Sequence, residues 1–138
     1  MKIRLAQIAD TDAVYALARS FATSFVVEEH IFRHSFSELI VSAGAYLAVA
    51  EVQEQIVGYV LGFVHYTLYA NGRVAWVEEI MVSEALRRQG IGQHLMAEFE
   101  VWAAYRGCEL IALATRRASA FYASLGYEES AAYFRNLL

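Results

Sequence analysis

The chain has 138 residues and a mass of 15.5 kDa, which is enough for one domain with a single hydrophobic core. Apolar residues make up 58% of it and Pro is absent, so the composition excludes a disordered or low-complexity protein. The net charge of -4 argues against a nucleic-acid partner held by bulk electrostatics. The most apolar stretch, Ile56–Val64, is much shorter than the roughly 20 residues that span a bilayer, so we expect no membrane partner either.

The cysteine content indicates a cellular compartment, and the distribution of charge indicates which part of the chain could bind an anion. No secretory signal pattern opens the chain, and its one cysteine, Cys108, cannot form an internal disulfide, so we expect a cytoplasmic protein. Residues 1–84 carry a net charge of -5, whereas residues 85–138 carry +1. An anionic ligand is therefore expected in the second part of the chain.

The first half of the chain predicts a strand, two helices and an antiparallel meander. Ile3–Gln7 alternates like a short strand, and the polar side chains at residues 10–12 offer N-cap oxygens to a helix that follows. A second helix is expected within Ile31–Ser42. Turn signals at residues 53–55 and 71–72 then separate three predicted strands, which are Tyr46–Glu51, Ile56–Tyr66 and Val74–Val82.

The second half predicts a helix, a strand and a further helix. Apolar residues recur at helical spacing in Gly92–Arg106, and Leu110–Ala114 is a short apolar run typical of a strand covered on both faces. Ala118–Leu125 predicts a helix stopped by a glycine, and the tail Tyr127–Leu138 has room for a last strand or two. The alternation of strands and helices implies a parallel pairing through a right-handed crossover. We therefore predict an α/β fold with a mixed sheet flanked by helices, in one domain over residues 1–138.

The turn that leads into the long helix is the most informative segment for function. Residues 82–92 run from a strand through Gly90 and Gly92 into the helix, and such a junction binds anions because free N–H groups and the helix dipole point at the ligand. The residues after Gly92 exclude a P-loop, and Leu95 stands where a dinucleotide fingerprint needs a third glycine. A turn whose glycines merely permit tight packing is the structural alternative.

Two adjacent carboxylates interrupt an otherwise apolar strand. Both alternating sets of Val74–Val82 are apolar, so one carboxylate is expected on each face, with Glu78 beside Trp76 and Ile80 and with Glu79 opposite. An unpaired ionised carboxylate in an apolar layer is costly, so at least one should open onto a polar cleft. The alternative is a carboxylate that pairs with an arginine or caps a neighbouring turn.

In this order, these segments resemble the general-control-related N-acetyltransferase superfamily, abbreviated GNAT. The acetyl coenzyme A motif of that family, Gln/Arg-x-x-Gly-x-Gly/Ala, is matched by Arg87-Arg-Gln-Gly-Ile-Gly92. The later motif of the family is matched in register by Ala118, Phe121, Tyr122, Gly126 and Tyr127. Two departures are visible, since Thr115 occupies the customary Asn position and Glu84 stands where Pro is frequent.

The resemblance implies an N-acetyltransferase that moves an acetyl group from acetyl coenzyme A to a primary amine of a small molecule, a peptide or a protein. Amine attack would be direct, in a ternary complex, with Glu78 as proton acceptor, the backbone N–H of Ile80 as donor to the carbonyl oxygen, and Tyr122 assisting the departing thiolate. No metal is implied, and a homodimer is expected. The implied cofactor residues come from the strand, the glycine turn and the later motif, and they are Ile80, Met81, Val82, Arg87, Arg88, Gln89, Gly90, Ile91, Gly92, Thr115, Ala118 and Tyr122.

Two other functions stay open on the sequence. A module of the same fold could sense acyl coenzyme A without turnover, although the presence of both Glu78 and Tyr122 counts against it. The glycine turn could also hold a phosphate of another nucleotide. The resemblance places acceptor selectivity roughly in Ser20–Ser42 and Tyr66–Arg73, where the sequence offers no motif. The acidic first half is compatible with a cationic amine.

Overall fold

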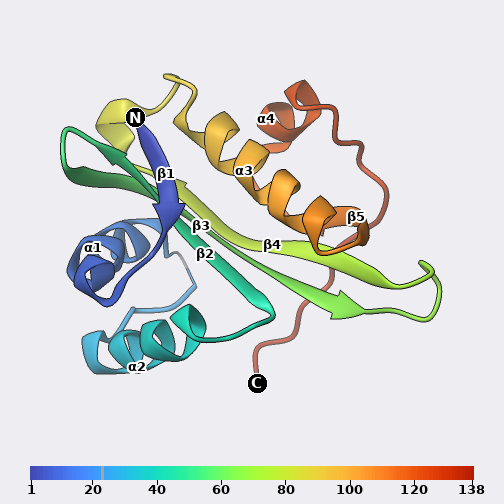
Figure 1. Cartoon of the computed structure of the whole chain (residues 1–138), viewed down its shortest axis with the longest axis horizontal. Coiled ribbons are helices and arrows are strands. Elements are labelled where there is room, and N and C mark those ends of the chain that lie inside the picture. Colours follow the sequence, from blue (N-terminus) through green and yellow to red (C-terminus); the bar gives the residue numbers. More distant parts are fainter. Residues whose placement is uncertain (23) are drawn as a thin grey trace.

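A computed structural model describes residues 1–22 and 24–138, and it contains one mixed sheet with helices on both faces (Figure 1). The five strands lie in the order β1-β2-β3-β4-β5; the first four pair antiparallel, and β5 pairs parallel to β4. The predicted fold class is therefore confirmed. The strands are β1 Lys2–Leu5, β2 Ala45–Val52, β3 Gln55–Tyr66, β4 Arg73–Val82 and β5 Cys108–Leu113. The helices are α1 Thr11–Phe21, α2 Glu29–Ile40, α3 Ile91–Tyr105 and α4 Ser119–Ser124, with short 3₁₀ turns η1 Ile8–Asp10 and η2 Glu84–Leu86.

Both tight turns of the meander lie where the sequence predicts them. Gln53 and Glu54 join β2 to β3 and have φ angles of 51° and 66°, as the hairpin turns that match the twist of two strands require. Asn71 and Gly72 precede β4 and also have positive φ angles, of 57° and 138°. These local signals fix the order of the three central strands.

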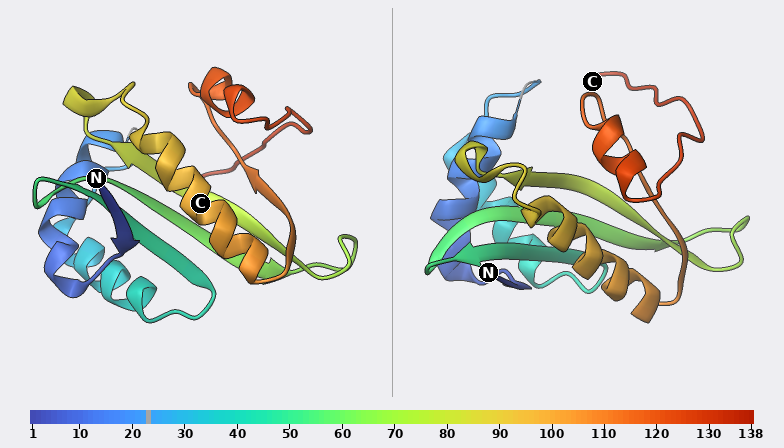
Figure 2. Two further views of the ribbon diagram at one scale, coloured as in Figure 1. Left: turned by 45° about the horizontal axis from the view of Figure 1, so that its top comes forward. Right: turned by 90° about the horizontal axis from the view of Figure 1, so that it is seen from above.

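The two faces of the sheet carry different helices (Figure 2). Helices α1 and α2 cover one face of the sheet, which we call the α1–α2 face. Val14 and Tyr59 belong to one buried cluster there. Helix α3 packs on the opposite α3 face, where Leu95, Met96 and Phe99 are fully buried in a second cluster. The sheet thus separates two apolar layers, and the stripe predicted on α3 is the one that it buries.

Glycines in β3 allow α3 to lie close to the sheet. A Cβ atom on Gly62 would be 2.1 Å from Cε1 of Phe99, and one on Gly58 would be 2.9 Å from the carbonyl oxygen of Met81. Real Cβ atoms do not come so close to other heavy atoms, so a side chain at either position would push the helix or the neighbouring strand away. The position of α3, and of its N-terminus, therefore depends on these two glycines.

Two expectations about the second half are wrong. Strand β5 is an edge strand, with Glu109 exposed and Leu110 39% exposed, so it is not covered on both faces. Residues 128–138 are described in full and contain no helix or strand. Their apolar side chains at Tyr133 and Phe134 are 62% and 89% exposed.

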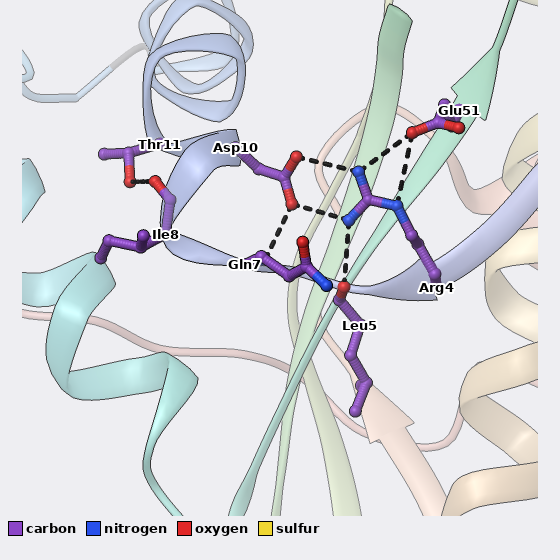
Figure 3. Close-up of polar contacts among 7 residues, drawn as sticks. All are labelled: Arg4, Leu5, Gln7, Ile8, Asp10, Thr11 and Glu51. Carbon is purple, nitrogen blue, oxygen red and sulfur yellow. Dashed lines mark hydrogen bonds and ion pairs between the residues drawn. The ribbon is translucent and has the colours of Figure 1, made fainter. Parts of the chain in front are cut away.

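A polar network ties β1 to the start of α1 and to β2 (Figure 3). The Arg4 guanidinium lies 2.8 Å and 3.0 Å from the two carboxylate oxygens of Asp10, and 3.0 Å from Oε1 of Glu51. Asp10 also accepts the N–H of Gln7 at 2.8 Å. The Arg4 bonds hold the pKa of Asp10 below its ordinary value although the carboxyl is buried. The expectation that the side chain of Asp10 caps α1 is therefore wrong, because its oxygens bind Arg4 and Gln7.

Among the described residues, no helix is both long and apolar enough to cross a membrane. Cys108, at the start of β5, is a half-buried free thiol. Burial raises the pKa of this thiol above its ordinary value, which disfavours the reactive thiolate.

We expect Gly62→Ala to lower the free energy of unfolding by about 1–3 kcal/mol, the usual cost of overpacking a core. The added Cβ would lie 2.1 Å from the buried ring of Phe99 and 2.9 Å from the carbonyl oxygen of Trp76. Gly44→Ala is the matched control, since its Cβ would make an ordinary contact 3.6 Å from the carbonyl oxygen of Val64. Urea denaturation of the two variants measures the difference, and equal stabilities would contradict this account of α3 packing.

Candidate active site

Strands β4 and β5 separate beyond the middle of β4. The last paired residues are Val77 and Leu113, whereas β4 continues to Val82. The final five residues of β4 therefore have no strand partner on the side where β5 would lie. An unpaired strand edge inside a fold offers backbone N–H and C=O groups to a ligand.

The hydrogen-bond pattern shows which N–H groups point into this gap. Ser83, directly after β4, donates its N–H to the carbonyl oxygen of Val57 at 2.7 Å. In an antiparallel pair the direction of the N–H groups alternates from residue to residue. Counting back from Ser83, the N–H groups of Val82 and Ile80 point away from β3 and toward the open edge.

A bulge in β4 decides where its side chains point. Leu61 pairs with Glu79 and Gly62 pairs with Val77, so Glu78 is an extra residue without a partner on β3. One extra residue moves all later side chains to the other face. Accordingly Val77 and Ile80 both pack in the cluster under α3. The expectation that Ile80 shares a face with Trp76 and Glu78 is wrong for this reason.

Both carboxylates consequently lie on the α1–α2 face. The indole N–H of Trp76, which points away from the α3 face, donates to Oε2 of Glu78 at 2.9 Å. Tyr59, buried in the α1–α2 cluster, donates its O–H to Oε1 of Glu79 at 2.7 Å. Burial and the carboxylate of Glu79 raise the pKa of Tyr59 well above its ordinary value, so its phenol stays protonated and donates. The expectation of one carboxylate on each face is therefore wrong.

The turn after β4 has the backbone conformation of an anion site. Arg88 and Gly90 have φ angles of 66° and 83°, and α3 begins directly after Gly90. The first N–H group of α3 with a helical acceptor is that of His94, which bonds to the carbonyl oxygen of Gly90 at 3.0 Å. The N–H groups of the three preceding residues lie in the first turn, where they have no acceptor within the helix, and the positive end of the helix dipole adds to them.

The arginines of the turn differ in their contacts. Arg87 folds back on β4, where its Nε donates to the carbonyl oxygen of Val82 at 3.2 Å and its Nη2 lies 3.7 Å from the sulfur of Met81. Arg88 and the neighbouring Gln89 are exposed. Arg87 therefore ties the turn to the end of the strand, while the Arg88 side chain stays in solvent.

Helix α4 brings Tyr122 to the same gap. Tyr122 is 7% exposed and belongs to the α3-face cluster, and burial raises its pKa above the ordinary value of a phenol. A Cβ on Gly92 would come within 3.3 Å of the ring of Phe121, so a glycine at the start of α3 is what admits α4. Thr115, at the family's Asn position, accepts the N–H of Ala118 through its hydroxyl at 3.0 Å and so ties down the loop before α4.

One open cleft runs past all these features, from the α1–α2 face over β4 to α4. It is lined by Glu78 and by every residue of the expected cofactor set except Gln89. Two features that sequence reasoning missed also lie on it, namely the Tyr59–Glu79 hydrogen bond and the tail with Tyr133 and Arg135. Neither has a local sequence signal, because each depends on residues far apart in the chain. The contact of Trp76 with Glu78 agrees with the face that the sequence predicts for the two residues. Within residues 1–22 and 24–138, no group of three or more His, Cys, Asp or Glu side chains could hold a metal ion.

Comparison with known proteins connects this geometry to a family. The model of the acetyltransferase (GNAT) family matches residues 11–127. The chain is 29% identical over 133 residues to the aminoalkylphosphonate N-acetyltransferase of Salmonella typhimurium, an alignment that covers 94% of this chain and 86% of the relative.

Solved structures share the whole fold. A structure described as a transcriptional regulator from Bacillus halodurans is 26% identical, with a TM-score of 0.88 and 99% of both chains covered. Glucosamine-6-phosphate N-acetyltransferase from Arabidopsis thaliana is 18% identical, with a TM-score of 0.87, 99% of this chain and 97% of that chain covered, and it shares the fold. The family match spans the strand, the turn and the helix that form the cleft. The chain belongs to the GNAT family of acetyltransferases and is an acetyl coenzyme A-dependent acyltransferase.

Proposed function

We propose that the chain is an N-acetyltransferase that transfers the acetyl group of acetyl coenzyme A to the primary amine of a small molecule, by direct attack in a ternary complex. The observation that carries this proposal is the meeting of an open β4 edge, an anion-binding turn and two carboxylates in one cleft. The relative from Salmonella typhimurium, an aminoalkylphosphonate N-acetyltransferase, supports a small-molecule amine as acceptor.

The cofactor would lie along the gap between β4 and β5. Its pyrophosphate would bind the free N–H groups at the start of α3, with Gly90, whose Cβ would have no neighbour closer than 3.8 Å, leaving room for the phosphates. The pantetheine arm, which carries amide groups, would pair with the open edge of β4 and so reach Ile80. The half-buried side chains of Ile80 and Val82 face α3, which leaves their backbone N–H groups as the polar contacts in the gap.

The chemistry divides among three groups. The amine nitrogen attacks the thioester carbonyl carbon and loses a proton to Glu78, whose exposed carboxylate is suited to a relay through water. The N–H of Ile80 stabilises the negative charge that forms on the carbonyl oxygen. The carbon–sulfur bond then breaks, and the phenol of Tyr122 protonates or stabilises the departing thiolate. The raised pKa of Tyr122 keeps this proton in place until the thiolate forms.

We expect Gly90→Ala to weaken coenzyme A binding by about tenfold or more, because the loss of one charge-assisted hydrogen bond to a phosphate is worth at least roughly 1.4 kcal/mol. Gly107→Ala is the matched control: its φ of 77° is close to the 83° of Gly90, so both variants carry similar backbone strain, but Gly107 lies at the other end of α3 and does not itself line the cleft. Calorimetry with coenzyme A measures both affinities. A folded Gly90→Ala protein with the parent affinity would exclude this turn as the phosphate site.

We expect Glu78→Gln to lower turnover by roughly 10²–10⁴-fold, the usual effect of losing a general base, with little change in coenzyme A affinity. Glu79→Gln is the control on the neighbouring carboxylate, since the amide oxygen of Gln can still accept the hydrogen bond of Tyr59. Thiol release followed against pH in both variants checks the assignment. Full activity and an unchanged pH profile in Glu78→Gln, together with a large loss in Glu79→Gln, would transfer the role to Glu79.

We expect Tyr122→Phe to depress turnover while leaving the stability of the fold nearly unchanged, since only the hydroxyl is removed from a buried ring. Replacing Tyr127 in the same way is the control, because its ring packs beside that of Tyr122 while its hydroxyl donates to Glu100 at 2.7 Å. Rates of thiol release and thermal unfolding of the two variants separate catalysis from packing. Parent turnover in Tyr122→Phe would remove this phenol from the mechanism.

A further inference from the structure

A buried tyrosine of β3 holds the side chain of Glu79 at the cleft. Tyr59 is 2% exposed, and its hydroxyl donates to Oε1 of Glu79 at 2.7 Å. Glu79 itself is half-buried and lines the cleft. Burial and the neighbouring carboxylate raise the pKa of the Tyr59 phenol, so the phenol keeps its proton and remains a donor. A hydrogen bond to an ionised acceptor is stronger than a neutral one, so this bond fixes the direction of the carboxylate.

The carboxylate of Glu79 keeps its negative charge open to the cleft. Within the part of the chain that the structure describes, no positively charged side chain forms an ion pair with Glu78 or Glu79. Arg87, which folds back on the same strand, donates to the carbonyl oxygen of Val82 at 3.2 Å instead. A half-buried carboxylate without a partner of opposite charge is costly. Glu79 is therefore suited to a cation that enters the cleft.

The bulge places Glu78 beside Glu79 on the α1–α2 face. Neighbouring Cα atoms are about 3.8 Å apart, so the two carboxylates can contact one nitrogen atom. Their surroundings differ, since Glu78 is exposed and accepts the indole N–H of Trp76, whereas Glu79 is half-buried and bonded to a buried phenol. A primary amine with a pKa of about 10.4 is an ammonium ion with three N–H donors near neutral pH. Such an ion can bind the fixed carboxylate and still reach the exposed one.

We propose that Glu79, held in place by Tyr59, binds the acceptor as its ammonium ion before Glu78 receives the proton. Glu79 is on this account an acceptor-binding residue that takes no part in the proton transfer. Tyr59 is almost fully buried and acts through Glu79, so it is a positioning residue. The proposal rests on the proposed acetyl transfer and assigns the binding of the amine within it.

The test measures KM and kcat for four simple amines, which are propylamine, benzylamine, cadaverine and spermidine, with acetyl coenzyme A at saturation. For the best acceptor of the parent protein, Glu79→Gln should raise KM by roughly 10- to 100-fold. The amide of Gln keeps the bond from Tyr59 but lacks the charge that holds the ammonium ion. Turnover at saturating amine should stay within about threefold of the parent value, because binding is weakened and the proton acceptor is intact.

Tyr59→Phe should raise KM by roughly threefold to tenfold, because the ring stays and the carboxylate of Glu79 loses the bond that directs it. In the Glu79→Gln background the same change should add little, since a positioning residue acts through the group that it positions. Tyr46→Phe is the matched control. It removes the hydroxyl of another buried tyrosine of the sheet, which packs on the α3 face and does not line the cleft, so the kinetic constants should stay at the parent values.

Two results would overturn the proposal. An unchanged KM in Glu79→Gln, or a loss confined to kcat, would show that Glu79 does not bind the ammonium ion. An equal rise of KM on Tyr59→Phe in the parent and in the Glu79→Gln background would show that Tyr59 acts on the fold and not through Glu79. Because Glu79→Gln keeps the bond to Tyr59, the first comparison decides the binding role even where Tyr59→Phe fails to fold.

The failure of the proposed function would be visible separately. If no amine is acetylated, the transfer reaction itself fails, and calorimetry of benzylamine with the coenzyme A-saturated protein then decides the ammonium site. Benzyl alcohol is the neutral analogue. Binding of benzylamine but not of benzyl alcohol, weakened in Glu79→Gln and kept in Tyr46→Phe, supports the site. Absence of benzylamine binding to the parent protein, or equal binding to the parent and to Glu79→Gln, overturns it.

Discussion

The extra residue in β4 is the constraint on which the rest of the site depends. Glu78 has no partner on β3, and pairing with β5 stops one residue before it, at Val77. A bulge bends a strand and increases its local twist, so the end of β4 turns away from β5 and leaves an open edge. The same extra residue turns Glu79 to the face of Tyr59 and Ile80 to the face of α3. One residue thus accounts for the gap between β4 and β5 and places Glu79 on the same face as Glu78.

The packing of α3 in the hydrophobic core positions the backbone N–H groups at the N-terminus of this helix. The helix lies close to β3 because Gly62 leaves room for the ring of Phe99, and this contact is made in the fully buried part of the core. The N-terminus of the same helix supplies the free N–H groups at the mouth of the gap, so core packing sets their place relative to β4. A binding group that consists of backbone atoms has to be positioned in this way, since it has no side-chain rotamer to adjust.

Local signals explain what the sequence predicts well. The turns at residues 53–54 and 71–72, the apolar stripe of α3 and the glycine turn before it each depend on residues a few positions apart, and all are present. The bulge was missed because nothing in Val74–Val82 announces an extra residue, and a regular alternation assigned each later side chain to the wrong face. The Tyr59–Glu79 hydrogen bond could not be predicted for a related reason, because it depends on the register of two strands.

The tail shows a second limit of the same kind. The mostly apolar segment 131–138 fits a strand in composition, but whether such a segment pairs with the edge of a sheet is a property of the whole fold. In this chain the segment instead reaches Ser24 through Arg135.

The family comparison separates the elements around the gap from the C-terminal tail. The family model ends at residue 127, after the strand, turn and helices around the gap between β4 and β5, and the tail lies outside it. Groups that bind a common cofactor have to be shared among relatives, whereas groups that select an acceptor need not be. Arg135 lies in the segment outside the match and approaches a loop that lies on the α1–α2 side. The residues that select the acceptor of this chain therefore need not lie in the segment that the family model matches.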